Sequence, residues 1–176
     1  MRLTVLLPLI CAIAVPAHAQ QAGGVSGIHF NIASPLVSPM FDNSLYTAQL
    51  GPRRVNVAHA QKLIAAGNYA EADAMLSKII GETSSKQVPF LKGVAKLGMG
   101  DAAAARRYFE KSLYYGKNGM PGAMSGLALA EIRLGNRDAA QNILDKLRYQ
   151  QEKCSSNCDR AKPLDQAVAV VEKALI

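Results

Sequence analysis

The chain has 176 residues and a formal net charge of +7, with 20 lysines and arginines against 13 aspartates and glutamates. Hydrophobic residues make up 49% of the chain, which is enough to bury a core. Basic and acidic residues are mixed, and no aromatic residues are interleaved with the basic ones in the pattern that single-stranded nucleic acid requires. We therefore expect no nucleic-acid partner.

Residues 1–19 have the features of a cleavable signal peptide. A short basic start precedes an apolar run over 3–15, and the small–x–small pattern of Ala17 and Ala19 follows. The run is shorter than the roughly 20 residues that span a bilayer. The sequence predicts export, to a periplasm or beyond, with cleavage after Ala19. An uncleaved membrane anchor is the alternative.

Residues 20–52 are predicted to form an extended arm. Glycines and prolines interrupt any helical period, and Asp42 is the single charged residue. The arm also carries large apolar side chains between Phe30 and Leu50, which disordered segments usually lack. We expect the arm to pack back onto the rest of the chain. The alternative is that the arm stays exposed and available to bind a partner.

A glycine followed by an amphipathic stretch recurs three times, at Gly67, Gly100 and Gly135. The intervals are 33 and 35 residues. An alanine stands five residues after each glycine, and a large apolar residue nine after it; these are Ala72, Ala105 and Ala140, and Leu76, Phe109 and Leu144. Helical patterning at this period predicts stacked helix–turn–helix units.

The predicted helices lie on both sides of these glycines. They cover 55–66, 69–80, 85–99, 102–113, 121–134 and 138–151, and a terminal helix covers 162–176. The terminal helix has one apolar stripe and is predicted to cap the open end of the stack.

Residues 55–151 resemble the tetratricopeptide repeat family. The resemblance rests on the three glycine turns and the positions after them, and on small residues seven before each glycine: Ala60, Gly93 and Ala128. The family's bulky residue four before the glycine is present as Leu63 but replaced by Lys96 and Glu131. The resemblance implies an all-α, right-handed α-solenoid of about three repeats with a capping helix, over 53–176. Related helical repeats of slightly longer period are the alternative fold.

In that family the first helix of each repeat lines a groove that receives partner segments. Carried over by position, the resemblance implies a groove of Val57, Gln61, Ile64, Phe90, Val94, Leu97, Leu129 and Ile132. The lysines and asparagines with which one subclass clamps a carboxylate are absent from these positions. The alternative is that Phe90, Val94 and Leu97 belong to the core.

The function that these features predict is an exported adaptor that binds a segment of another envelope or secreted protein. One alternative is attachment of a basic protein to an anionic envelope surface, lipid or polysaccharide. An enzyme is the weaker alternative, because no catalytic, phosphate-binding or metal-binding motif occurs. We expect no cofactor and no metal.

Cys154 and Cys158 are the two cysteines left once Cys11 departs with the signal peptide. An even number of cysteines in an oxidising compartment favours a disulfide. The bond is predicted to fix how the terminal helix docks.

Overall fold

The described part of the chain is built from α-helices alone. The computed structural model describes residues 52–113, 119–154 and 158–176, all of which belong to one compact unit. The helices are α2 (Pro52–Ala65), α3 (Tyr69–Ile79), α4 (Gln87–Gly98), α5 (Ala102–Leu113), α6 (Pro121–Arg133), α7 (Arg137–Lys153) and α8 (Ala161–Leu175). None of them is long and apolar enough to cross a membrane. The predicted signal peptide and residues 20–51 of the predicted arm lie outside the described residues.

The helix boundaries agree with the predicted ones to within three residues. The largest difference is at α2, which begins at Pro52 and not at residue 55. Proline is accepted in the first turn because the amide hydrogen that it lacks has no helical partner there. The predicted arm therefore ends at residue 51. Helix α7 continues to Lys153 because no glycine or proline stops it before the cysteine loop.

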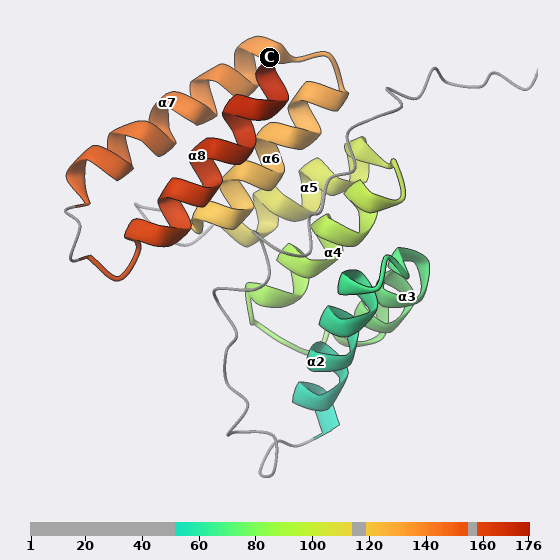
Figure 1. The fold of residues 1–176 in the computed structure, drawn as a ribbon. Helices are drawn as coiled ribbons and strands as arrows, with labels where there is room; N and C mark the ends of the chain where they lie inside the picture. Colours follow the sequence, from blue (N-terminus) through green and yellow to red (C-terminus); the bar gives the residue numbers. More distant parts are fainter. Residues whose placement is uncertain (1–51, 114–118, 155–157) are drawn as a thin grey trace, which may run out of the picture. The chain divides into compact units, whose positions relative to one another are not determined.

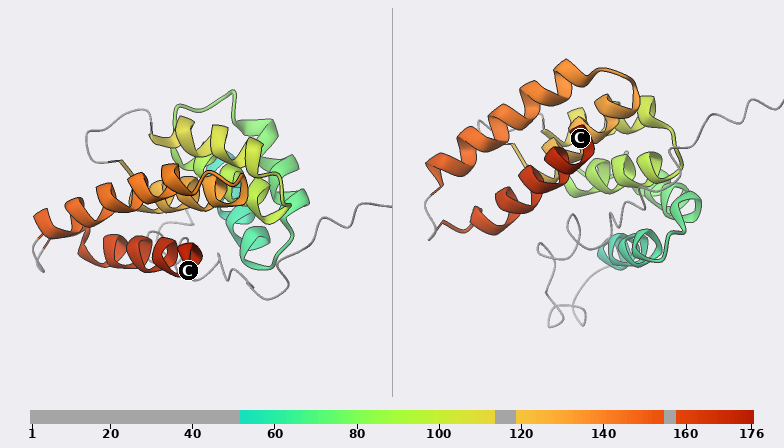
Figure 2. Two further views of the ribbon diagram at one scale, coloured as in Figure 1. Left: turned by 90° about the horizontal axis from the view of Figure 1, so that it is seen from above. Right: turned by 45° about the horizontal axis from the view of Figure 1, so that its top comes forward.

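Successive helices pack against each other along the whole described series (Figure 1). The first helices of successive pairs are also in contact: α4 touches both α2 and α6, and α6 touches α8. The views in Figure 2 show α6, α7 and α8 side by side. This pattern is that of stacked helix pairs, as the predicted α-solenoid requires.

The small residues of the repeat lie at close contacts between helices. Ala72, Ala105 and Ala140 have no exposed surface, and the large residues four positions later are at most 2% exposed. Phe109 shows why small residues are needed. Its ring lies against Gly93 of α4 and Gly126 of α6, so closely that a Cβ added at either glycine would come within 2.8 Å of a ring carbon. The predicted register is confirmed.

Helix α8 covers the end of the stack, as predicted. Its buried stripe packs into one cluster with residues of α6 and α7; the stripe consists of Leu164, Ala167, Val168 and Val171. The residues that α6 and α7 contribute to this cluster include Met124, Leu144 and Leu147. Without α8, these side chains would be open to water.

Candidate functional site

Three identical turns orient the helices of the repeats. Gly67, Gly100 and Gly135 have φ of 81°, 84° and 82°, the left-handed region that favours glycine. In the first turn the amide of Gly67 donates to the carbonyl of Ile64 (3.0 Å), and the amide of Asn68 donates to that of Leu63 (2.8 Å). The same two bonds recur at the other two turns. This is the Schellman motif, which ends one helix and sets the direction of the next.

The structure places most of the predicted groove residues inside the protein. Five of the eight are at most 2% exposed: Ile64, Phe90, Val94, Leu97 and Leu129. The prediction that these five side chains lie on the surface of an open groove is therefore wrong. Their apolar side chains are buried between packed helices, and the ring of Phe90 lies 6.1 Å from that of Phe109. Their burial agrees with the alternative that Phe90, Val94 and Leu97 belong to the core.

Val57, Gln61 and Ile132 keep part of their surface exposed. The side-chain nitrogen of Gln61 is itself buried and has no hydrogen-bond partner in the structure as described. Leaving a buried amide unpaired costs about 1–3 kcal/mol. A binding role for these three residues stays a prediction.

Ion pairs join each repeat to the next, and they occupy equivalent positions. Asp73, six residues after the first glycine, contacts Lys96 of α4 through its second carboxylate oxygen at 2.9 Å. Arg106, six residues after the second glycine, contacts Glu131 of α6 at 3.0 Å. Lys96 and Glu131 both stand four residues before their own glycines. The two pairs therefore link the same positions with opposite signs.

Neighbouring groups complete both pairs. The ammonium of Lys92, which is only 4% exposed, lies 2.5 Å from Asp73 and donates to Ser77. Glu131, also 4% exposed, accepts from the side chain of Asn136 at 2.7 Å. Buried charges that are paired and hydrogen-bonded avoid the large cost of an isolated one.

The α3–α4 pair shifts the pKa of both partners. Burial alone would raise the pKa of Asp73, but the hydrogen bonds and charges of Lys92 and Lys96 outweigh burial and hold it below 3.8. The pKa of Lys96 is raised above 10.5, chiefly because its ammonium donates to Asp73. Both groups are therefore charged at neutral pH.

These buried charges were not among the predicted site residues. The sequence did contain a signal for them. Lys96 and Glu131 are the charged residues that replace the family's bulky one. For each of them, a residue of opposite charge stands six positions after the turn glycine of the preceding repeat.

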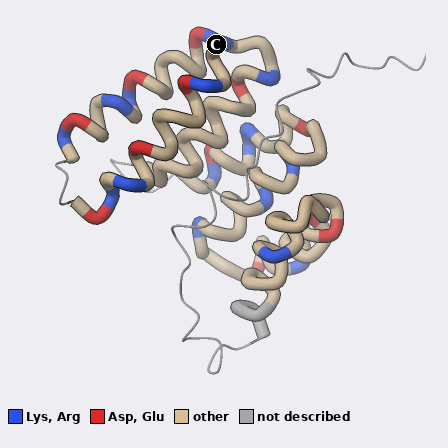
Figure 3. Tube along the Cα trace, viewed as in Figure 1, with Lys and Arg blue, Asp and Glu red and all other residues tan. Residues whose placement is uncertain are grey.

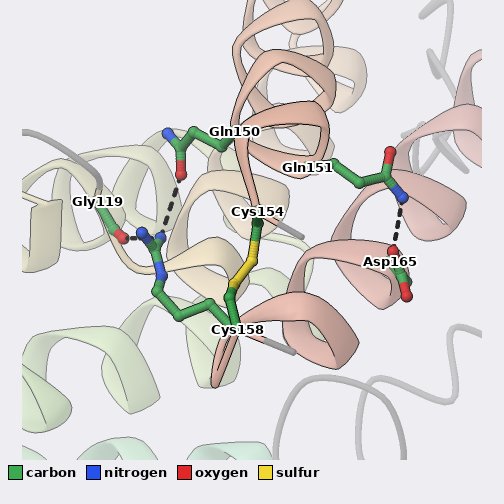
Figure 4. Close-up of a disulfide and its surroundings, with 7 residues drawn as sticks. Gly119, Gln150, Gln151, Cys154, Cys158 and Asp165 are labelled. Atoms are coloured by element: carbon green, nitrogen blue, oxygen red, sulfur yellow. Dashed lines mark hydrogen bonds between the residues drawn. A yellow bond between two sulfur atoms is a disulfide. The ribbon is translucent and has the colours of Figure 1, made fainter. Parts of the chain in front are cut away.

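Cys154 and Cys158 are joined by a disulfide, as predicted (Figure 4). Around it, Arg160 donates to the carbonyl of Gly119 (2.8 Å), and Gln151 donates to Asp165 (2.7 Å). Further along, Arg148 of α7 contacts Glu172 of α8 at 2.7 Å. The disulfide and these polar contacts hold α8 on α7, and the start of α8 on the segment before α6.

Acidic and basic residues are interspersed along α7 and α8, whereas the charged residues of α4 are both lysines (Figure 3). No group of three or more histidine, cysteine, aspartate or glutamate side chains is arranged to hold a metal ion in the described segments.

The chain was compared with known families and proteins. Residues 96–162 match the model of the tetratricopeptide repeat family. The matched residues include the end of α4, all of α5, α6 and α7, and the start of α8. No curated protein and no solved structure matches the chain. The matched segment contains two of the three glycine turns, and the first repeat shares their bonds and their buried alanine. Residues 96–162 thus resemble tetratricopeptide repeats, and the stacked helix pairs of the described chain form an α-solenoid of helical repeats.

Proposed function

We propose that the protein is an exported adaptor that binds a segment of another envelope or secreted protein. The observation that carries the proposal is the match of residues 96–162 to tetratricopeptide repeats. Repeats of this family are typically non-catalytic modules for protein–protein interaction. Export rests on the sequence of residues 1–19, and a disulfide is in keeping with an oxidising compartment.

The partly exposed first-helix positions, Val57, Gln61 and Ile132, are the proposed contact residues. They follow the family's groove positions, and each keeps part of its surface exposed. Most of the predicted groove is buried, so this contact surface is smaller than the one inferred from the family.

The test is cross-linking in native cells followed by co-purification with the tagged chain. The mature chain should begin at Gln20, and it should carry a specific protein partner. Gln61→Arg should reduce recovery of that partner at least about ten-fold, since it places a charge on a contact surface. Asn142→Arg adds the same charge to an exposed position of α7 and should leave recovery unchanged. An unprocessed chain, or the absence of a specific partner, would contradict the proposal.

A further inference from the structure

An open depression lies between the loop that joins α3 to α4 and the outer face of α5. It has a volume of about 720 Å³. The loop contributes residues 80–81 and 83–86, with Pro89 beside them, and α5 contributes Arg107, Tyr108, Glu110 and Lys111. We call it the α3–α4 depression. It contains none of the predicted groove residues.

Positive charge predominates in the α3–α4 depression. Three cations line it, Lys86, Arg107 and Lys111, against one carboxylate, Glu110. That carboxylate is already engaged, because Arg106 contacts it at 3.0 Å. Lys86 also has an interaction within the chain, so that Arg107 and Lys111 carry the positive charge available to a ligand.

Arg107 and Lys111 have no acidic partner in the structure as described. Both are exposed, and Lys111 makes only a contact with the ring of Tyr108, 5.5 Å from its centre. They stand four residues apart on α5 and therefore on the same face, where like charges destabilise a helix slightly. In the described repeats Lys96, Arg106 and Arg148 are paired with carboxylates, whereas Arg107 and Lys111, like the exposed Lys146 and Lys173, are not. An anionic ligand would supply the missing partner to Arg107 and Lys111.

The rest of the lining indicates what carries the anionic group. Ile80, Pro89 and the half-buried ring of Tyr108 provide apolar surface beside the cations, and Thr83, Ser84 and Ser85 provide hydroxyl groups. A peptide that combines carboxylates with aliphatic side chains matches this mixture, whereas a simple anion would use only the cations.

We propose that the α3–α4 depression binds an acidic, partly apolar peptide segment of a partner protein. Arg107 and Lys111 pair with its carboxylates, and Ile80, Pro89 and Tyr108 contact its apolar side chains. The inference rests on the proposed adaptor function and adds a second contact surface, separate from Gln61.

The test measures binding of a short fluorescein-labelled peptide of glutamate and leucine to the full chain by fluorescence anisotropy, at about 0.15 M salt. Saturable binding is expected. The double variant Arg107→Gln, Lys111→Gln should weaken it at least about ten-fold. The matched control Lys146→Gln, Lys173→Gln removes the same charge from exposed positions of α7 and α8 and should change the affinity less than about two-fold. As a second check, Arg107→Glu with Lys111→Glu should bind a peptide in which lysine replaces glutamate.

Equal weakening in the two double variants would mean that only net charge matters, and it would overturn the proposal. Binding to phosphatidylglycerol vesicles but not to the peptide would overturn it in favour of a lipid surface. These outcomes are independent of the adaptor test. A partner that co-purifies equally with wild type and with Arg107→Gln, Lys111→Gln would leave the adaptor function standing and reject this site.

Discussion

At the scale of single residues, the packing depends on side chains that are small. The three alanines five residues after the turn glycines are completely buried, and Gly93 and Gly126 flank the ring of Phe109. Interiors are packed closely enough that a few added atoms must displace their neighbours. Volume at these positions should therefore control stability more than hydrophobicity does.

Ala105→Leu should lower the free energy of unfolding by about 1–3 kcal/mol, because three carbons must be forced into a filled contact. Ala103 lies on the same helix but is exposed, so that Ala103→Leu is the matched control and should change stability by less than about 0.5 kcal/mol. Urea denaturation of both variants measures the difference. Equal effects would show that the register of α5 is wrong.

Gly126→Ala tests the contact with Phe109 directly. The new Cβ would lie 2.5 Å from a ring carbon, and a cost of about 1–3 kcal/mol is expected. In a Phe109→Leu background that cost should shrink, which a double-mutant cycle would measure as a coupling energy. Gly81→Ala, where nothing lies within 4 Å, serves as the control. If the effects of Gly126→Ala and Phe109→Leu on the free energy of unfolding are additive, the contact with Phe109 is not the cause of the destabilisation.

At the scale of helices, the second helix of each repeat is tied to the first helix of the next by an ion pair. Asp73 and Lys96 join α3 to α4, Arg106 and Glu131 join α5 to α6, and Arg148 and Glu172 join α7 to α8. The first two are partly buried and shared with other groups, whereas the third is exposed. Exposed pairs usually contribute little, about 0–1 kcal/mol.

The pH dependence of the α3–α4 pair has a definite sign. The pKa of Asp73 is lower in the folded protein than its ordinary 3.8, so its contribution to stability is present above that value and is lost as the pH falls through the folded pKa. Asp73→Asn should therefore destabilise the protein at about pH 7, and the difference from wild type should narrow below about pH 4. Guanidinium denaturation of both proteins between about pH 7 and pH 4 measures this difference in stability.

The control for this experiment is Asp145→Asn on α7. Asp145 is exposed, and among the described residues it accepts a side-chain hydrogen bond from Gln141 of its own helix. Its substitution should leave the pH profile of stability close to that of wild type. A difference between Asp73→Asn and wild type that stays constant from neutral to acid pH would contradict the assigned pairing.

The helices and their order could be predicted from the sequence because both depend on local signals. Glycine marks each turn, and spacings of three and four residues mark each buried face. The groove could not be predicted in the same way. Whether Phe90 faces a partner or the core depends on what packs over it, and nothing in the local spacing records that. The α3–α4 depression likewise depends on a loop meeting a helix more than 20 residues away.

At the scale of the whole described unit, stability depends on how the last repeat is closed. Helix α8 buries four apolar residues against α6 and α7, and the disulfide fixes the loop before it. The disulfide closes a very short loop, so its entropic contribution is about 2 kcal/mol at most. Burial of each large apolar side chain contributes about 1.5–3 kcal/mol. Apolar burial, more than the disulfide, should therefore hold α8 in place.

Deleting residues 160–176 should expose Met124, Leu144 and Leu147 and lower the midpoint of thermal unfolding strongly. Binding of a hydrophobic dye should rise at the same time. The full-length variant with Cys154→Ser and Cys158→Ser keeps α8, and it should melt between the truncated chain and wild type. A truncated chain that melts like wild type and binds no dye would show that α8 is dispensable.

The opposite signs of the two partly buried ion pairs have a consequence for the order of the repeats. If the middle repeat were deleted, the first would meet the third, and Asp73 would stand opposite Glu131. If the middle repeat were duplicated, Arg106 would stand opposite Lys96. Either rearrangement replaces an attractive pair by like charges at a partly buried junction, which destabilises that junction. Each junction thus favours its own neighbour by charge, so that an engineered longer array would need compensating substitutions at each new junction.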